Sequence, residues 1–453
     1  MQDQYALRNK YPEFIFESFS VEVGADGVHA NFLYRLGEYE FKPTVSIAIE
    51  DVRNRDINID FLSELFFNFG IINAINYYKL TCAPKFVIKA GKLTAEQREF
   101  FKKLFFYGLG EFMYVNKLDL NYGNFLEIVA EEPTDIPHFE LDNNFSGNLI
   151  TVGGGKDSIV AIEALEPMRE QNIFLQYNRN IYPPNEAALN SIRAAGYALS
   201  EIVDFNLTLD QKMLDLNKEG YYNGHIPFSS CLAFASLISA YLNNRAFIVL
   251  SNEASANEGN IAGTGINHQY SKSFEFENDF QNYVAKYLTD KIYYFSILRC
   301  FNEFEIVQKF LKFRKYLDIF RSCNVGTREN KWCSHCAKCL YVYIMLAPFV
   351  EPVDMIRVFD HNLLDDKSLL DIFIGLINPD VTKPFECVGT REEIDYSLRL
   401  YLEKLVTEGK KLPALIEYYR DNIFDPNRQY NIAGYFNQEH HIPEQYLKMV
   451  LAL

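Results

Sequence analysis

The fold is decided by one stretch, Asn148-Leu149-Ile150-Thr151-Val152-Gly153-Gly154-Gly155-Lys156-Asp157-Ser158. Its apolar first half predicts a short buried strand, and its glycines predict a turn into a helix that starts near Lys156. Glycine tolerates positive φ and has no Cβ, so backbone N–H groups of such a turn can converge on an anion. The following helix adds unpaired N–H groups and the positive end of its dipole. The stretch therefore predicts a phosphate-binding loop, with an ordinary strand-to-helix turn as the alternative.

The predicted cofactor-binding residues of this loop are Gly153, Gly154, Gly155, Lys156, Asp157 and Ser158. The stretch is not a Walker loop, because the four-residue spacing and the closing Gly-Lys-Ser/Thr are missing. It resembles the Ser-Gly-Gly-x-Asp-Ser loop of ATP pyrophosphatases, which split ATP into AMP and pyrophosphate. Gly153 stands where that superfamily usually has serine, so one hydroxyl contact to phosphate is missing.

The composition is that of a globular protein: 453 residues, 48% hydrophobic and 23% charged. The formal net charge of -16 argues against broad electrostatic binding to nucleic acid or to an anionic membrane. The sequence contains no recognisable secretory signal and no apolar run of the length that a membrane span needs. We therefore expect a cytoplasmic protein that binds neither nucleic acid nor membrane.

The order of expected elements divides the chain into three regions. Residues 1–145 are expected to form an N-terminal α+β domain, a candidate for substrate binding. Residues 146–346 alternate strands with helices, which predicts an α/β domain with a doubly wound parallel sheet. Its expected strands are residues 149–152, 172–176, 201–205 and 246–250. The phosphate loop then lies at the carboxyl end of the first strand, where ligands bind in such sheets. Residues 347–453 are expected to form a helical C-terminal region.

A long polar loop after the expected strand 246–250 is the second candidate site. It contains Asn252, Glu253, Asn257, Glu258, His268, Lys272 and Glu275. Since it leaves the carboxyl edge of a buried strand, we expect it to border the nucleotide crevice. These residue types can bind Mg²⁺, neutralise phosphate charge or transfer protons. A solvated surface loop is the alternative.

A third feature is a cluster of four of the eight cysteines, Cys323, Cys333, Cys336 and Cys339. Thiolates at Cys-x-x-Cys spacing, together with one earlier thiolate, can form a tetrahedral S₄ site. We expect structural Zn²⁺ there, and an iron–sulfur cluster is the rival. His335, inside the cluster, is expected to be a bystander.

Residues 383–393 form a weaker candidate. Thr390 and Glu393 predict the N-cap and third residue of a helix. Lys383 and Arg391 flank that helix start and are candidates to meet a substrate phosphate or carboxylate.

Together these stretches resemble the UDP-N-acetylmuramoyl-L-alanyl-L-glutamate epimerase family of peptidoglycan synthesis, within the PP-loop ATP pyrophosphatase superfamily. The resemblance rests on residues 153–158, 251–253, 255–258, 267–273, 332–339 and 383–390, and spans roughly residues 20–400. The cysteine cluster is also similar to the zinc site of 7-cyano-7-deazaguanine synthase. An ATP-dependent ligase or amidotransferase of that kind is therefore the alternative, and a non-catalytic nucleotide sensor is opposed by the intact Asp157 and Ser158.

The resemblance implies an enzyme that uses ATP and Mg²⁺ to adenylylate the glutamate carboxylate of a UDP-N-acetylmuramoyl dipeptide. Adenylylation removes the negative charge that opposes carbanion formation, so the α-proton can be exchanged before AMP is released. The roles that it implies are His268 for proton transfer, with His225 or Cys231 as the second group, Glu253 and Glu258 for Mg²⁺, Lys156 and Lys272 for phosphate charge, Asp157 as loop anchor, and Asn252 and Asn257 for the nucleotide. The sequence leaves the oligomeric state open.

Overall fold

The computed structural model describes residues 5–453, except residues 137–138, 142–143, 258, 260–266 and 327–328. Its strands are β1 Glu13–Gly24, β2 Gly27–Leu36, β3 Tyr39–Phe41, β4 Thr44–Ala48, β5 Lys85–Lys92, β6 Glu127–Glu131, β7 Asn148–Thr151, β8 Asn172–Arg179, β9 Ile202–Thr208, β10 Phe247–Leu250 and β11 Tyr293–Ser296. Its helices are α1 Ala6–Lys10, α2 Ile59–Asn73, α3 Ile75–Tyr78, α4 Ala95–Gly108, α5 Gly110–Val115, α6 Tyr122–Phe125, α7 Lys156–Ala164, α8 Glu186–Ala194, α9 Lys212–Lys218, α10 Phe228–Leu242, α11 Phe274–Tyr287, α12 Glu303–Phe310, α13 Ala337–Leu346, α14 Pro352–Phe359, α15 Leu370–Ile377, α16 Arg391–Thr407, α17 Ala414–Asn422 and α18 Glu444–Leu451. The polar loop carries two short 3-10 turns, η4 Ala254–Asn257 and η5 Tyr270–Lys272.

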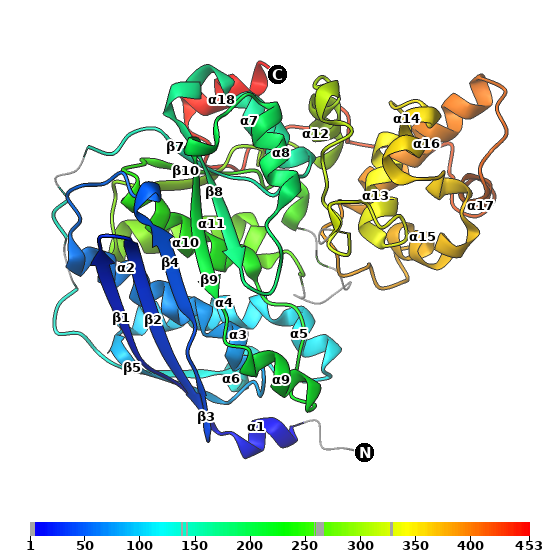
Figure 1. Ribbon diagram of the computed structural model, residues 1–453. Coiled ribbons are helices and arrows are strands. Elements are labelled where there is room, and N and C mark those ends of the chain that lie inside the picture. The colour runs from blue at the N-terminus through cyan, green and yellow to red at the C-terminus, as the bar shows by residue number, and fades with distance from the viewer. Residues whose placement is uncertain (1–4, 137–138, 142–143, 258, 260–266, 327–328) are drawn as a thin grey trace.

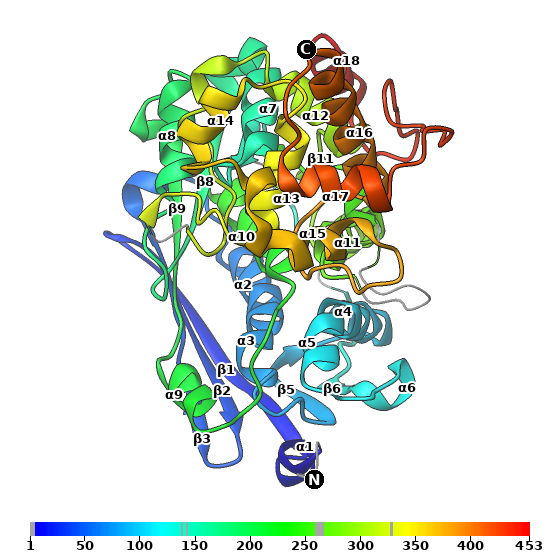
Figure 2. The same ribbon diagram turned by 90° about the vertical axis from the view of Figure 1, so that its right-hand side faces the viewer.

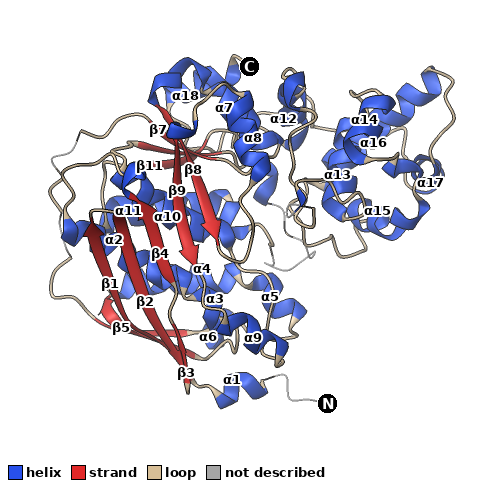
Figure 3. Ribbon diagram, in the orientation of Figure 1, coloured by secondary structure: helices blue, strands red, loops and turns tan. Residues whose placement is uncertain are grey.

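The strands form one 11-stranded mixed sheet with the order β11-β10-β7-β8-β9-β4-β2-β1-β5-β6, and β3 pairs with β2. Figure 3 shows this sheet as a single twisted layer that runs through the molecule. The expected strands are confirmed as β7 to β10, and β11 was not predicted.

Strands β7 to β11 pair in parallel, as the βα alternation predicts. The chain passes from β7 to β8 and β9 on one side, then returns to β10 on the other side of β7. The strand order therefore reverses between β7 and β10. In open α/β sheets, ligands bind at the carboxyl ends of the strands at such a reversal. The phosphate loop and the polar loop both leave the sheet there.

The parallel part of the sheet, β7 to β11, is covered on both faces, and alternate side chains along its strands belong to two different cores. Leu149 and Ile173 belong to a core shared with α2, α4, α10 and α11. Their neighbours Ile150 and Phe174 belong to a second core shared with α7, α8, α12 and α13. Because successive side chains point to opposite faces, strands covered on both sides are continuous apolar runs. This explains the apolar sequence that precedes the three glycines.

The N-terminal strands belong to the same sheet. Strand β4 pairs antiparallel with β9, with Thr44 opposite Thr208 and Ser46 opposite Asn206. The core of residues 11–128 is continuous with the core around α10. The boundary expected at residue 145 thus lies between β6 and β7, within one sheet.

The region after residue 347 is helical, as predicted. Helices α14 to α17 gather on one side of the molecule, away from β1 to β5 (Figures 1 and 2). Helix α18 instead packs on α7. There the Tyr446 hydroxyl donates to Asn148 Oδ1 at 2.5 Å, and the Tyr446 ring packs on Phe247 and Phe295. Within the described residues, no helix has the length and apolarity of a membrane span.

Candidate active site

A cavity of about 390 Å³ lies at the carboxyl ends of β7, β8 and β10. The residues that line it include Asp157, Ser158, Asn252, Glu253, Lys272, Lys338, Glu386 and Cys387. These residues come from the phosphate loop, the polar loop, the cysteine-rich segment and the segment before α16. The structure therefore brings all four stretches that the sequence singled out to one cavity.

The phosphate loop has a fixed shape. Gly154 has φ of +82°, and a Cβ there would lie 2.6 Å from the Ala188 backbone nitrogen in α8. The Ser158 hydroxyl accepts from the Gly154 N–H at 3.1 Å and donates to the Gly155 carbonyl at 3.0 Å. The Arg321 N–H donates to the Gly154 carbonyl at 2.8 Å. The loop thus requires glycine at position 154, and Ser158 holds the loop itself.

The lysines of this region differ in whether they line the cavity. Lys156 is 3% exposed and forms ion pairs with Asp157 and with Glu303 at the start of α12. Lys272 and Lys338 line the cavity instead. Burial acts to raise the pKa of Asp157, but Lys156, Lys338 and Lys272 outweigh it and lower that pKa. Asp157 is therefore held as a carboxylate, and the described cations that line the cavity are Lys272, Lys338 and Arg321.

Glu253 faces the same cavity from the end of β10. Burial and the negative charge of Asp157 raise the pKa of Glu253 above its ordinary value, against the opposing charges of Lys272 and Lys156. Carboxylate oxygens beside bound phosphates are the ligands that Mg²⁺ prefers, and a cation would relieve the repulsion between these two groups. Asp157 and Glu253 thus fit Mg²⁺.

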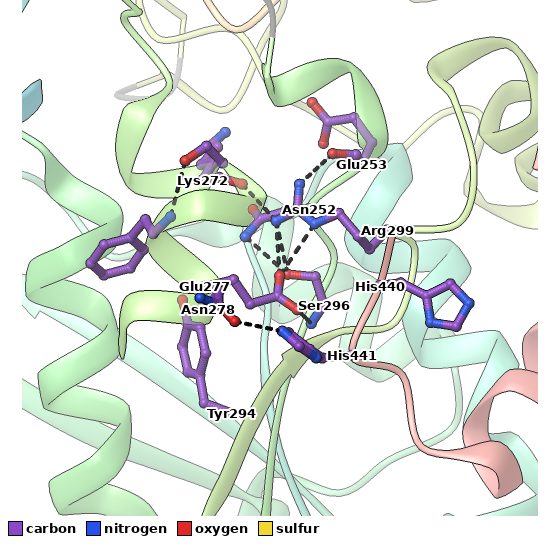
Figure 4. A network of polar contacts seen from close by, with 12 residues as sticks. Asn252, Glu253, Lys272, Glu277, Asn278, Tyr294, Ser296, Arg299, His440 and His441 are labelled. Atoms are coloured by element: carbon purple, nitrogen blue, oxygen red, sulfur yellow. Dashed lines mark hydrogen bonds and ion pairs between the residues drawn. The ribbon is translucent and has the colours of Figure 1, made fainter. Parts of the chain in front are cut away.

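A buried ion pair fixes the backbone of the polar loop (Figure 4). Arg299 is fully buried, and its Nη2 lies 2.9 Å from Glu277 Oε2. The same guanidinium donates to the carbonyls of Glu253 and Lys272, each at 2.6 Å. The backbones of two predicted catalytic residues are therefore held by one guanidinium, which no sequence motif indicated.

A thiol, two imidazoles and a carboxylate form a cluster of polar contacts at the cavity wall. Lys272 Nζ lies 3.3 Å from Cys387 Sγ. His268 hydrogen-bonds to the Cys387 thiol, and its Nδ1 bonds to Glu111 in α5. The His225 ring lies 4.1 Å from the His268 ring, and its Nδ1 is 3.8 Å from Glu111 Oε2. The predicted His268 and His225 are thus brought together, with Cys387 and Glu111 as their unpredicted partners.

Burial and charge act in opposite directions on the pKa values of Cys387 and His268, and in the same direction on the pKa of His225. Burial acts to raise the pKa of the Cys387 thiol, but Lys272, His268 and Lys338 outweigh it and lower the pKa to about 6. Burial acts to lower the pKa of His268, but its bonds to Cys387 and Glu111 raise it to about 9. Burial lowers the pKa of His225 to about 3, reinforced by His268.

Other predicted candidates lie elsewhere. Cys231 is 2% exposed in the core, where burial raises its pKa to about 12, so the structure places it away from the cavity. Glu275 forms an ion pair with Lys103. Glu258 and the side chain of Asn257 lie outside the described residues.

The four clustered cysteines have the geometry of a metal site. The Sγ–Sγ distance is 3.8 Å for Cys323 and Cys336, and 3.6 Å for both Cys333–Cys339 and Cys336–Cys339. A tetrahedral site with metal–sulfur bonds of about 2.3 Å places its sulfurs about 3.8 Å apart. The four residues therefore fit a tetrahedral ion such as Zn²⁺. The exposed His335 bonds to the Cys333 carbonyl and stays a bystander.

The helix start predicted near residue 390 is confirmed. Thr390 is the N-cap of α16, with Glu393 completing the capping box. Glu393 Oε1 also accepts from the Ser255 hydroxyl at 2.7 Å, which ties the polar loop to α16. Arg391 donates to the Val381 carbonyl at 2.6 Å. The described lining of the cavity includes neither Arg391 nor Lys383.

Comparisons with known proteins identify the family. Residues 6–297 match the family described as MurL N-terminal domain, and residues 319–423 match MurL C-terminal domain. A relative from Xanthomonas oryzae pv. oryzae, named UDP-N-acetyl-alpha-D-muramoyl-L-alanyl-L-glutamate epimerase, is 31% identical over 82% of this chain and 82% of its own length. Relatives of the same name from a Micromonospora species and from Salinispora tropica are 30% and 31% identical, over 86% of this chain and 87% and 85% of their own.

No solved structure is significantly similar to the chain. The two family regions together contain the phosphate loop, the polar loop, the cysteine cluster and Cys387. The chain therefore belongs to the MurL family of epimerases.

Proposed function

We propose that this protein epimerises the terminal L-glutamate of UDP-N-acetylmuramoyl-L-alanyl-L-glutamate to D-glutamate through ATP-dependent adenylylation. The observation that carries the proposal is the single cavity lined by the glycine loop, Lys272, Lys338, Asp157 and Glu253. This set supplies a phosphate cradle, cations and metal-binding carboxylates at the strand-order reversal of the sheet. The loop is then a PP-loop, and the names of the relatives supply the substrate.

The first step joins the substrate carboxylate to AMP. A carboxylate oxygen attacks the α-phosphorus of ATP, the bond from that phosphorus to the bridging oxygen breaks, and pyrophosphate leaves. Loop N–H groups, Lys272 and Lys338 offset the charge that develops on the phosphates. Asp157 and Glu253 would hold Mg²⁺, which neutralises the leaving pyrophosphate when bound.

The mixed anhydride makes epimerisation possible. In the free substrate, the carboxylate charge opposes a second negative charge on the neighbouring carbon. In the anhydride, the carbonyl can accept the electron pair of the broken Cα–H bond. Return of a proton to the opposite face inverts the centre, and water then releases AMP and the D-glutamate product.

The cysteine cluster would hold structural Zn²⁺. Arg321, Ser322 and Asn324, which adjoin Cys323, line the cavity. The Gly326 N–H donates to Cys323 Sγ at 3.2 Å, a contact that stabilises a thiolate. A metal at the four sulfurs would therefore fix one wall of the nucleotide site without taking part in the chemistry.

The test is incubation with ATP, Mg²⁺ and UDP-N-acetylmuramoyl-L-alanyl-L-glutamate in deuterated water. We expect AMP and pyrophosphate to form only with the dipeptide, and deuterium to enter the glutamate α-carbon. Chiral analysis of the glutamate separates an epimerase from a ligase, which would release pyrophosphate but leave the L-configuration. Absence of both pyrophosphate and deuterium would refute the proposal.

A further inference from the structure

We propose that Cys387 is the catalytic residue that takes the α-proton of the activated glutamate, and that Lys272, His268 and Glu111 position it. The assignment rests on the proposed function, since it concerns the step that follows adenylylation. It replaces His268, the proton-transfer group that the sequence favours.

The geometry places the Cys387 thiol where it can reach a substrate. Cys387 lines the cavity together with Asp157 and Glu253, the residues assigned to the nucleotide and Mg²⁺. Its backbone carbonyl accepts from Lys338, which ties it to the first turn of α13. Its sulfur lies 3.3 Å from Lys272 Nζ. Cys387 is thus held through its backbone by Lys338 and through its sulfur by Lys272, and it lines the cavity.

His268 cannot itself serve as the base. Its Nδ1 is bonded to Glu111, its ring also hydrogen-bonds to Cys387, and His268 is not among the described residues that line the cavity. An imidazole between a carboxylate and a thiol orients the thiol and stabilises its anion, as in cysteine–histidine pairs. His268 is a positioning residue, and Glu111 orients it.

The charges around Cys387 favour a thiolate at neutral pH. The cations that face it are Lys272 of η5, His268 of the preceding loop and Lys338 of α13. Against the effect of burial they bring the thiol pKa to about 6. A base whose pKa lies near the working pH combines availability with proton affinity. Cys231, buried in the core, has no such environment and a pKa of about 12.

The proton-transfer step balances without any further reagent. The Cα–H bond breaks, Cys387 Sγ takes the proton, and the electron pair moves onto the carbonyl oxygen of the anhydride to give an enolate. A proton of solvent origin then forms a new C–H bond on the opposite face. The thiol returns its proton to solvent before the next turnover.

The experiment compares wild-type protein with Cys387→Ala and Cys387→Ser in the deuterium assay. We expect both variants to keep dipeptide-dependent pyrophosphate release within about fivefold and to lose at least about 100-fold in deuterium incorporation. Cys82→Ala is the matched control. The Cys82 thiol is fully buried in the core of the N-terminal region, and Cys82 is not among the described residues that line the cavity.

The two hypotheses fail in different ways. If wild-type protein releases no pyrophosphate, the proposed function fails. If Cys387→Ala retains both pyrophosphate release and deuterium incorporation, only the assignment of Cys387 fails. Loss of both activities in a folded variant would also contradict the assignment, because it would place the thiol in adenylylation.

A measurement on wild-type protein avoids dependence on variants that fail to fold. The rate at which iodoacetamide alkylates Cys387, followed by mass spectrometry, should rise with pH around a midpoint near 6. An unperturbed thiol would give a midpoint of about 8.5. ATP with the dipeptide should slow the alkylation, whereas a midpoint near 8.5 without protection would overturn the proposal.

Discussion

Replacing Glu277 by glutamine tests whether the buried ion pair holds the catalytic loop. Glu277 Oε2 accepts from Arg299 Nε at 3.2 Å and from Nη2 at 2.9 Å, while Oε1 accepts from the Ser296 N–H at 3.2 Å. Glutamine keeps the shape but removes the charge and turns an NH₂ group toward these donors. Breaking one partner of a buried pair costs about 3–5 kcal/mol, because the other charge stays buried.

That free energy converts to a measurable shift in the melting temperature. With an unfolding entropy of about 2.1 cal/mol/K per residue, a 453-residue chain that unfolds as a unit has about 0.95 kcal/mol/K. Glu277→Gln should therefore lower Tm by about 3–5 °C. Since Arg299 also holds the carbonyls of Glu253 and Lys272, a displacement of about 1 Å should reduce kcat/KM for pyrophosphate release about 100-fold.

Differential scanning calorimetry and a coupled pyrophosphate assay measure the two effects. The control is Glu403→Gln, which removes the Arg399–Glu403 pair on the exposed side of α16 and should change neither quantity. A Tm within about 1 °C of wild type and an activity within twofold would refute the view that the ion pair positions the loop.

Three further outcomes are expected. Gly154→Ala forces a side chain into positive φ and against α8, so calorimetry should show Tm lowered by at least about 1–3 °C, whereas Gly153→Ala, with open space around its Cβ, should melt like wild type. Metal analysis should find about one zinc per chain, lost in Cys333→Ser together with thermal stability; an unchanged metal content would contradict the S₄ site. Asp157→Asn should lower Mg²⁺-dependent pyrophosphate release at least about 100-fold, and normal Mg²⁺ dependence would remove Asp157 from the metal site.

Local patterns predicted the parallel half of the fold. Continuous apolar runs and the glycine turn identified β7 to β10, because strands buried on both faces leave that signature. Strand β11, Tyr293–Ser296, was missed because it follows a charged turn directly and contains no aliphatic residue, unlike β7 and β10 of the same length. The pairing of β4 with β9 joins residues near 45 to residues near 207, and periodicity identifies a strand without naming its partner.

In the candidate site, too, features formed by neighbours in sequence were predictable, and contacts between distant residues were not. The cysteine cluster was predictable because its ligands are neighbours in sequence, and their sulfurs do converge. Cys387 was missed because its chemistry depends on Lys272, 115 residues away. Glu111 comes from a region in which the sequence analysis found no catalytic pattern, and only the fold brings it to His268, 157 residues later. A thiol gains or loses reactivity through such neighbours.

The packing of α18 on the phosphate-loop strand has a consequence for synthesis on the ribosome. Tyr446, which covers Asn148, Phe247 and Phe295, is translated 298 residues after Asn148. Until it emerges, an apolar patch at the amino ends of β7, β10 and β11 faces water. From the synthesis of β11 until α18 arrives, the nascent chain therefore holds an aggregation-prone surface and should engage chaperones.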